Sequence, residues 1–299
     1  MPNSAPLPAL SVGDALACQQ RLNATSTSPK LDCQLLLMYA MGQSRSWLLT
    51  HDEQRLTPAE ADLFRWLLNR RAAGEPIAYL LGTQGFWDMD LLVSPATLIP
   101  RPETELLVEI LLQALPASQP IKLVDLGTGT GAIALALARE RPAWQIHATD
   151  RHAATLRVAQ DNIRRWSPDN VLLVRAHWLA AFGSTSFDVI VANPPYICPG
   201  DPHLPNLKFE PETALVADGG GLGDLQQIIN AARRCLKPNG LLLLEHGFDQ
   251  QQTLRATLQQ HGFIEIQPFT DLNHQPRAIL AKLEDFECAN SATPEETWA

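Results

Sequence analysis

The sequence predicts an α/β protein with a mostly parallel, seven-stranded sheet, one antiparallel edge and an N-terminal bundle of helices. Between residues 121 and 283, strand-like apolar runs alternate with helix-like runs, a pattern typical of a parallel sheet covered by helices on both faces. The last two strand-like runs are joined by a polar loop without a helix, so they can pair as antiparallel neighbours. Residues 10–76 carry apolar side chains at helical spacing.

The composition is that of a globular protein rather than a nucleic-acid-binding or disulfide-rich one. The chain has 299 residues and 45% hydrophobic content, which is enough for a sizeable core. Its net charge of -9 repels phosphate backbones, so we expect no direct nucleic-acid partner. Five cysteines without a C-x-x-C pair indicate reduced thiols. The eight histidines have no metal-ligand spacing, and we expect no metal site.

The N-terminal sequence shows no targeting signal. Met1 to Ser4 contains no basic region leading into an apolar segment, and no window of the chain approaches 18 uninterrupted apolar residues. We therefore expect a cytoplasmic protein that does not contact membranes, and we expect it to be a monomer.

The changes in character along the chain predict four segments. Residues 1–76 form the helical bundle, 77–99 a β-hairpin linker, 100–283 the sheet domain, and 284–299 an acidic tail that we expect to be disordered. Thr57-Pro58-Ala59-Glu60 has the form of a capping box at the start of a helix that ends near Gly74. The bundle is either a plain helical domain with a solvated basic rim or a domain that binds a macromolecular partner.

A glycine-rich loop, Asp125 to Gly131, lies between the first strand and the first helix of the predicted sheet. Its glycines allow the backbone to approach a ligand closely, and the helix N-terminus favours a negatively charged group. Asp150 ends the next strand, where a carboxylate can accept hydrogen bonds from both hydroxyls of a ribose. The Gly-x-Gly-x-Gly spacing favours a mononucleoside over a dinucleotide. A tight turn without a ligand and an ordinary surface acid are the alternatives.

Asn193-Pro194-Pro195-Tyr196 follows the buried-looking run of residues 187–192 and forms a stiff, polar corner. The lone pair of an amide or aromatic amino nitrogen is delocalised, so a methylating enzyme must hold the N–H groups with acceptors and align the nitrogen with the methyl donor. The Asn193 side-chain oxygen and the Pro194 carbonyl can provide these acceptors, and Tyr196 can pack on the acceptor group. This corner therefore predicts methyl transfer to nitrogen, with Asn193 and Pro194 as the catalytic residues. A turn that only ends a strand is the alternative.

A second stiff loop precedes the first strand of the sheet domain. Residues 99–105 contain two prolines that restrict the backbone and two acidic residues before a helical run. This loop is either a plain helix start or a wall of the active site.

The glycine-rich loop, Asp150 and Asn193 to Tyr196, in this order, resemble class I S-adenosylmethionine-dependent methyltransferases that act on nitrogen. Five further segments narrow the resemblance to the bacterial HemK/PrmC family. They are Arg70 to Leu80, Phe86-Trp87, Ile99 to Glu105, Phe209-Glu210-Pro211 and Leu244 to Gly247. The resemblance covers roughly residues 10–283, the helical bundle included.

The resemblance implies a Rossmann-like fold and a defined reaction. The family transfers a methyl group from S-adenosyl-L-methionine to the side-chain nitrogen (N5) of the glutamine in the Gly-Gly-Gln motif of class 1 peptide chain release factors. S-adenosyl-L-homocysteine is the product, the release factor is the partner, and the bundle of residues 1–76 is expected to bind it.

The resemblance also implies roles for individual residues. Asp150 would hold the ribose of the cofactor and Trp178 would flank its adenine. The methionine end would be lined by Gly127, Thr128, Gly129, Thr130 and Gly131. The cofactor would also meet Asn193, and the acceptor glutamine would lie among Asn193, Pro194, Pro195 and Tyr196. Arg101 and Glu103 would lie near the substrate loop.

The sequence departs from the family pattern at two positions. His177 stands where the family usually has an acidic residue before the tryptophan, which puts a polar contact to the adenine amino group in doubt. Gly85 stands where the family has Glu before Phe86, a change expected only to loosen the hairpin.

Two other functions remain open at this point. The Asn193 to Tyr196 corner is shared with adenine methylases of DNA, so an adenine N6-methyltransferase acting on nucleic acid is an alternative, although the charge of -9 argues against it. A non-catalytic binding module that keeps the cofactor pocket is the other.

Overall fold

The computed structural model describes residues 10–166 and 168–285. It divides into two compact units, Met1–Thr83 and Gln84–Ala299, and each unit is described by itself. Residues 286–299, most of the predicted acidic tail, lie outside the described residues. No helix in the described part of the chain is long and apolar enough to cross a membrane.

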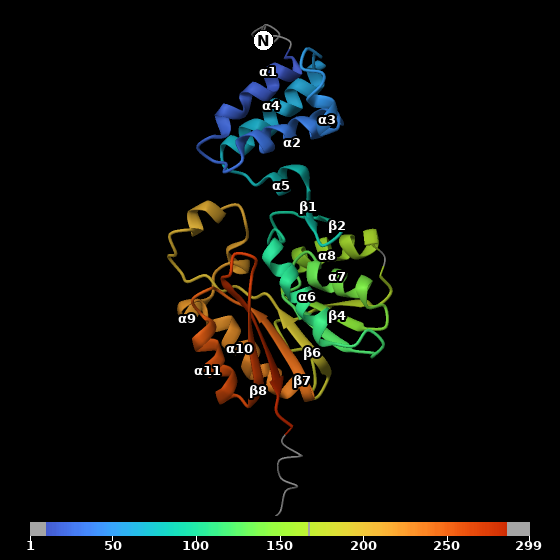
Figure 1. The fold of residues 1–299 in the computed structure, drawn as a ribbon, viewed down its shortest axis with the longest axis vertical. Helices are drawn as coiled ribbons and strands as arrows, with labels where there is room; N and C mark the ends of the chain where they lie inside the picture. The colour runs from blue at the N-terminus through green and yellow to red at the C-terminus, as the bar shows by residue number, and fades with distance from the viewer. Residues whose placement is uncertain (1–9, 167, 286–299) are drawn as a thin grey trace, which may run out of the picture. The chain divides into compact units, whose positions relative to one another are not determined.

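The first unit is a helical bundle (Figure 1). Its apolar core gathers side chains from the main helices, among them Val12, Leu36, Leu48 and Phe64, all without solvent exposure. Its helices are α1 Val12–Ala17, η1 Cys18–Leu22, α2 Pro29–Met41, α3 Arg45–Leu48, α4 Pro58–Ala72 and α5 Ile77–Leu81.

Helix α4 begins and ends where its sequence predicts. The Thr57 hydroxyl accepts a hydrogen bond from the Glu60 N–H, and the Glu60 carboxylate accepts one from the Thr57 N–H at 2.7 Å, so the capping box is formed. The helix ends at Ala72, and Gly74 follows with φ +97°, a conformation that glycine adopts readily.

The basic rim expected on α4 is not wholly solvated. The Arg71 side chain is 12% exposed and pairs with the Asp32 carboxylate of α2 at 2.7 Å, while it also donates to the Thr25 carbonyl at 3.0 Å. Arg71 therefore crosslinks the bundle, because a buried charge is stable only when it is paired. Arg70 pairs with Glu75, so these two arginines serve the bundle itself.

The segment predicted as a hairpin linker contains a helix and a hairpin. Residues 77–81 form α5, and the two-stranded sheet of β1 Thr83–Phe86 and β2 Met89–Leu92 follows. Trp87 lies at the hairpin turn with φ 56°, and its N–H donates to Glu105 at 2.7 Å.

The second unit contains the predicted seven-stranded sheet, which confirms the fold class. The strand order is β5-β4-β3-β6-β7-β9-β8; β9 and β8 are antiparallel to their neighbours, and the other pairs are parallel. The strands are β3 Lys122–Leu126, β4 Gln145–Asp150, β5 Val171–Arg175, β6 Phe187–Ala192, β7 Leu236–Glu245, β8 Phe263–Thr270 and β9 Pro276–Leu283.

Helices cover both faces of this sheet (Figure 1). Successive strand residues point to opposite faces. Val189 and Val191 of β6 thus join one apolar core, and Ile190 and Ala192 join the other. The first core is completed by α6 and α7 and the second by α10 and α11. The helices are η2 Pro102–Thr104, α6 Glu105–Ala114, α7 Ala132–Glu140, α8 Ala153–Trp166, η3 Leu204–Leu207, η4 Glu212–Ala214, α9 Asp218–Gly221, α10 Gly223–Cys235 and α11 Gln251–Gln260.

The strand order reverses direction at β3, because the chain proceeds from β3 outward through β4 and β5 and then returns to β6. Open α/β sheets bind ligands beyond the carboxyl ends of the strands at such a point. The loops after β3, β4 and β6 all begin at this edge, and they carry Gly127 to Gly131, Asp150 and Asn193.

Asn162 of α8 ties the hairpin to the glycine-rich loop. Its side chain has no solvent exposure and makes three hydrogen bonds to the backbone. Its Oδ1 accepts from the Leu92 N–H at 2.7 Å, and its Nδ2 donates to the carbonyls of Leu92 at 3.0 Å and Thr130 at 2.9 Å. The amide therefore helps satisfy the hydrogen-bonding groups of buried backbone at the end of β2 and in the glycine-rich loop.

We predict that Asn162→Ala lowers the free energy of unfolding by about 3 kcal/mol, because it leaves buried backbone groups without partners and creates a cavity. Urea unfolding followed by circular dichroism measures this loss. Asp161→Ala, at the adjacent exposed position of the same helix, is the control and should change stability by less than about 0.5 kcal/mol. Equal effects of the two substitutions would contradict the bridging role.

Candidate active site

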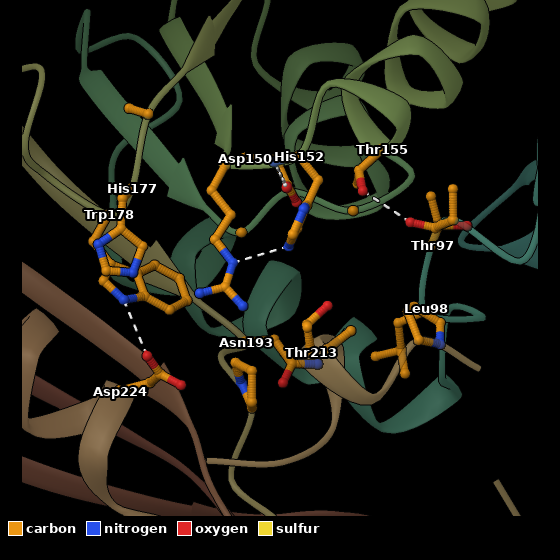
Figure 2. Close-up of a pocket in the computed structure, with 18 residues that line it drawn as sticks. Thr97, Leu98, Asp150, His152, Thr155, His177, Trp178, Asn193, Thr213 and Asp224 are labelled. Atoms are coloured by element: carbon orange, nitrogen blue, oxygen red, sulfur yellow. Dashed lines mark hydrogen bonds between the residues drawn. The ribbon is translucent and has the colours of Figure 1, made fainter. Parts of the chain in front are cut away.

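A pocket lies at the carboxyl edge of the sheet and brings together six residues singled out from the sequence (Figure 2). In this view Trp178 and Asp224 lie on one side of the pocket, Thr97 and Leu98 on the opposite side, and Asn193 between them. Its space, including the part open to solvent, is about 690 Å³, within the range of small-molecule sites. The six predicted residues in its lining are Gly127, Gly129, Asp150, Trp178, Asn193 and Pro195.

The glycine-rich loop forms a cradle that a side chain would fill. Gly127, Gly129 and Gly131 have φ values of +70°, +59° and +87°, in the left-handed region. A Cβ atom built on Gly127 would lie 3.1 Å from Cζ3 of Trp178. The loop therefore leaves its backbone bare where it faces the pocket, as required for the close approach of a ligand.

Trp178 is fixed in place from two sides. Its backbone has φ 45°, which is rare for a bulky residue and often marks a functional site. Its indole Nε1 donates to the Asp224 carboxylate at 3.2 Å, and its ring packs against Gly127. Asp224 lies in the first turn of α10, and sequence analysis did not identify it, because an acidic residue at a helix start is ordinary.

Asp150 ends β4 and lines the pocket with its carboxylate. Its Oδ1 accepts a hydrogen bond from the His152 N–H at 2.8 Å, which orients the group. Burial raises the pKa of Asp150 above its ordinary value, and the hydrogen bond and charge of His152 act against that rise. Hydroxyl donors of a ligand at this position could form further, charge-assisted hydrogen bonds with the carboxylate.

Thr128 and Gly131 have structural roles in the same loop. The Thr128 hydroxyl donates to Asp125 at 2.6 Å, and its N–H donates to the Thr149 carbonyl at 2.8 Å. Gly131 precedes α7, and a Cβ there would meet Leu135 at 3.4 Å. Thr128 and Thr130 line a smaller cavity next to the main pocket, whereas Gly131 lines none of the cavities described here.

A second cavity adjoins the first on the other side of Asn193. It is lined by the remaining predicted residues of the corner, Pro194 and Tyr196, and by Arg101 and Glu103. Asn193 lines this cavity, the main pocket and the smaller cavity of Thr128 and Thr130. Pro195, predicted for the acceptor, lines the main pocket and not this second cavity. The two cavities meet at Asn193, and Leu98 and Ala214 also line both.

The loop of residues 99–105 is a wall of the second cavity rather than only a helix start. The buried Glu210 carboxylate accepts from the Ile99 N–H at 3.0 Å and also pairs with the Arg101 guanidinium. Glu210 is only 3% exposed in its side chain. It therefore fixes the loop that carries Arg101 and Glu103 against the site.

The corner itself is held by two residues to which sequence analysis gave no role. The Asn193 Nδ2 donates to the Thr104 hydroxyl at 3.0 Å, and the Tyr196 hydroxyl donates to the Glu245 carboxylate at 3.2 Å. Thr104 and Glu245 lie in segments that carried the family resemblance. The resemblance identified the two segments as typical of the family. It did not predict their contacts with the corner, because these contacts join residues that are distant in the chain.

The two departures from the family pattern lie in different surroundings. His177 lines the main pocket beside Trp178, with ring centroids 5.6 Å apart. Gly85 lies in β1, where a Cβ would meet no atom within 4 Å. A longer side chain would thus fit at position 85, whereas position 177 faces the predicted adenine site.

The described residues contain no group of three or more His, Cys, Asp or Glu side chains that could hold a metal ion.

Comparison with known families matches both units of the chain. Residues 16–82 match the model of the PrmC N-terminal domain, and residues 104–203 match the model of the Methyltransferase small domain.

Among curated proteins, the chain is 45% identical to the release factor glutamine methyltransferase of Salmonella typhimurium, over 86% of this chain and 93% of that protein. It is 48% identical to the protein of the same name from Pseudomonas aeruginosa, over 86% and 94% of the two chains. The corresponding Escherichia coli protein is 43% identical over 86% of this chain and 93% of that protein.

Solved structures with the same fold include a methyltransferase from Pyrococcus furiosus, with a TM-score of 0.50 and 15% identity over 74% of this chain and 98% of that one. They also include the T. thermophilus 16S rRNA N2 G1207 methyltransferase in complex with AdoMet and guanosine. Its TM-score is 0.51, with 20% identity over 68% of this chain and 50% of that one. At these identities the likeness concerns the fold alone.

Asp125 predicts a pH dependence of stability. Burial raises its pKa from 3.8 to about 7, against the hydrogen bond from Thr128. The folded state therefore keeps a proton that the unfolded state loses between these two pH values, so stability falls as pH rises from about 4 to 7. We predict that Asp125→Asn flattens this fall, as measured by urea unfolding at pH 5 and pH 7.5. An unchanged difference between the two pH values would contradict the prediction.

Proposed function

The chain belongs to the family of release factor glutamine methyltransferases, and from this membership we propose its reaction in detail. It transfers a methyl group from S-adenosyl-L-methionine to the side-chain amide nitrogen (N5) of the glutamine in the Gly-Gly-Gln motif of class 1 peptide chain release factors. The observation that carries the proposal is the meeting of two cavities at Asn193, since methyl donor and planar acceptor must face each other there.

The residues of the main pocket fit S-adenosyl-L-methionine. The bare backbone of Gly127 and Gly129 suits the methionine end, the Asp150 carboxylate suits the ribose hydroxyls, and Trp178 supplies a flat apolar surface for adenine. Thr128, Thr130 and Gly131 complete the loop at the methionine end. When bound, the cofactor would supply a methyl group activated by its sulfonium charge. S-adenosyl-L-homocysteine would be the product formed beside the methylated glutamine, and the amide nitrogen would lose one proton to solvent after the transfer.

The protein's contribution to the reaction is orientation of the acceptor. The Asn193 Oδ1 and the Pro194 carbonyl accept hydrogen bonds from the two amide hydrogens of the glutamine, which turns the nitrogen lone pair towards the main pocket. Pro195 fixes the backbone of this corner. Tyr196 packs beside the acceptor amide. Placement of two reactants in this geometry can supply roughly 7–11 kcal/mol of barrier reduction.

The release factor contacts the chain in two places under this proposal. Arg101 and Glu103 line the acceptor cavity and receive the backbone around the glutamine. The helical bundle of residues 1–76 binds the body of the release factor, residues 77–99 join it to the catalytic domain, and that domain spans 100–283. The enzyme acts as a cytoplasmic monomer and binds neither nucleic acid nor membranes directly.

An adenine N6-methyltransferase would use the same corner. The relatives that match over most of the chain are release factor glutamine methyltransferases, and the net charge of -9 disfavours a nucleic-acid substrate. Both observations support glutamine rather than adenine as the acceptor.

We predict methyl incorporation from labelled S-adenosyl-L-methionine into a purified class 1 release factor, because the two cavities present the donor to an amide. Mass spectrometry should find one added methyl group on the motif glutamine. The control is the same release factor with its motif glutamine changed to alanine. Label that persists in this control would overturn the proposed acceptor.

Substitutions of Asn193 and Asp150 are expected to affect different quantities, the first kcat and the second the Kd of the cofactor. We predict that Asn193→Ala lowers kcat on the order of 100-fold with little change in the Kd of the cofactor, because its oxygen orients the acceptor. Asp150→Ala should instead raise that Kd by roughly 10-fold or more, through loss of hydrogen bonds to a carboxylate. Calorimetry and steady-state kinetics measure both. Parallel losses in the two variants would contradict the division of roles.

A further inference from the structure

We propose that Thr104 and Glu245 are positioning residues that fix the orientation of the Asn193 side-chain amide, with its oxygen towards the acceptor and its nitrogen away from it. The inference rests on the proposed function, since it assigns Asn193 Oδ1 the task of accepting an N–H from the substrate. It adds two residues outside the Asn193 to Tyr196 corner to the machinery of the reaction.

The contacts form a continuous chain of hydrogen bonds. Asn193 Nδ2 donates to Thr104 Oγ1 at 3.0 Å, and the Thr104 hydroxyl donates to Glu245 Oε2 at 2.8 Å. Thr104 is 5% exposed and Glu245 is 1% exposed. Water therefore has little access to these two groups and does not replace their bonds.

The direction of each bond follows from the donors that the groups possess. An ionised carboxylate only accepts, so Glu245 requires the single hydroxyl hydrogen of Thr104. With that hydrogen committed, Thr104 Oγ1 presents only lone pairs to Asn193. A lone pair pairs with the amide NH₂ and not with the amide oxygen. The carboxylate thus determines, through one hydroxyl, which end of the Asn193 amide faces the cavity.

The orientation matters because the two ends of an amide are similar in shape but opposite in hydrogen bonding. With Oδ1 in the cavity, Asn193 accepts from the substrate amide. With Nδ2 in the cavity, it would place N–H against N–H and leave buried groups unpaired, which is unfavourable.

The same carboxylate also holds the other end of the corner. Glu245 Oε1 accepts from the Tyr196 hydroxyl at 3.2 Å, so one side chain at the end of β7 orients both Asn193 and Tyr196. Arg277 of β9 lines the acceptor cavity with Glu245 and pairs with Asp271 at 3.3 Å. A carboxylate with a purely structural role would need neither the bond to Tyr196 nor a place in the lining of the acceptor cavity. A carboxylate that positions the corner uses both.

The ionisation of Glu245 sets the conditions of the test. Burial raises the pKa of Glu245 to about 7, and the nearby Glu103 charge adds to the rise. The hydrogen bonds from Thr104 and Tyr196 and the Arg277 charge act in the opposite direction. His246, which directly follows β7, has its own pKa lowered by burial, so it is neutral at pH 8. Measurements at pH 8 therefore examine the ionised, acceptor-only carboxylate.

We predict that Thr104→Val lowers kcat at pH 8 by 10-fold or more, while Thr104→Ser stays within 3-fold of the wild-type enzyme. Valine keeps the shape of threonine without the hydroxyl, and serine keeps the hydroxyl without the methyl group. The Kd of S-adenosyl-L-methionine should be unchanged in both, which also shows that both variants are folded. Thr104→Ala provides a second variant without the hydroxyl and should behave like Thr104→Val.

A second readout does not depend on turnover. The side-chain NH₂ signals of Asn193, identified by their loss in Asn193→Ala, should be protected from hydrogen exchange in the wild type and in Thr104→Ser. They should exchange at least 10-fold faster in Thr104→Val. This measurement tests the chain of hydrogen bonds even if the wild-type enzyme fails to methylate a release factor, a result that would overturn the proposed function instead.

Three results would overturn the positioning role. One is a kcat for Thr104→Val equal to that of the wild-type enzyme, in an assay in which the wild-type enzyme is active. Another is unchanged exchange of the Asn193 amide in that variant. The third is a loss in Thr104→Ser as large as the loss in Thr104→Val, which would assign the effect to packing of the methyl group rather than to the hydroxyl.

Discussion

The register of three parallel strands is the constraint on which the rest of the site depends. Leu126 at the end of β3 pairs with Thr149 of β4 on one side and with Ala192 of β6 on the other. The residues that follow these pairs are Gly127, Asp150 and Asn193, so they leave the sheet at one level. A shift by one residue would turn each side chain to the opposite face. The two apolar cores, which alternate along β6, prevent that shift.

Buried carboxylates hold the loops that this register places together. Glu210 ties the loop of residues 99–101, Glu245 joins Thr104 to Tyr196, and Asp125 receives the Thr128 hydroxyl. Burial raises the pKa of Asp125 and of Glu245 to about 7, which disfavours the charged folded state near neutral pH. The protein thus gives up some stability to keep acceptor groups fixed in the loops of the site, a cost that is common at sites that bind and orient substrates.

Much of the fold and part of the site could be predicted from the sequence. The alternation of apolar runs predicted the sheet, and the local chemistry of Gly127 to Gly131 and of Asn193 to Tyr196 pointed to residues of which most line the cavities at its carboxyl edge. The contacts of Trp178 with Asp224 and of Thr104 with Glu245 could not be predicted, since the second pair is 141 residues apart in the chain. A solvated basic rim was likewise one of two interpretations of the bundle, and helical spacing does not show that Arg71 lies beside Asp32 of another helix. Local patterns identify elements and corners, whereas the side chains that hold them depend on packing between distant segments.

The lining of the acceptor cavity bears on the choice between a glutamine and a base. Enzymes that act on a flipped base stack it between aromatic or apolar side chains and read its edge. Among the described residues of this cavity, Tyr196 is the only aromatic side chain, and its hydroxyl is bound to Glu245. Arg101, Glu103 and Arg277 bring both signs of charge to the same cavity. Leu98, Ile197, Leu207 and Leu215 of the same lining could flank either substrate. The charged groups suit the N–H and C=O groups of a peptide backbone, and they favour a loop of protein that delivers its amide to Asn193.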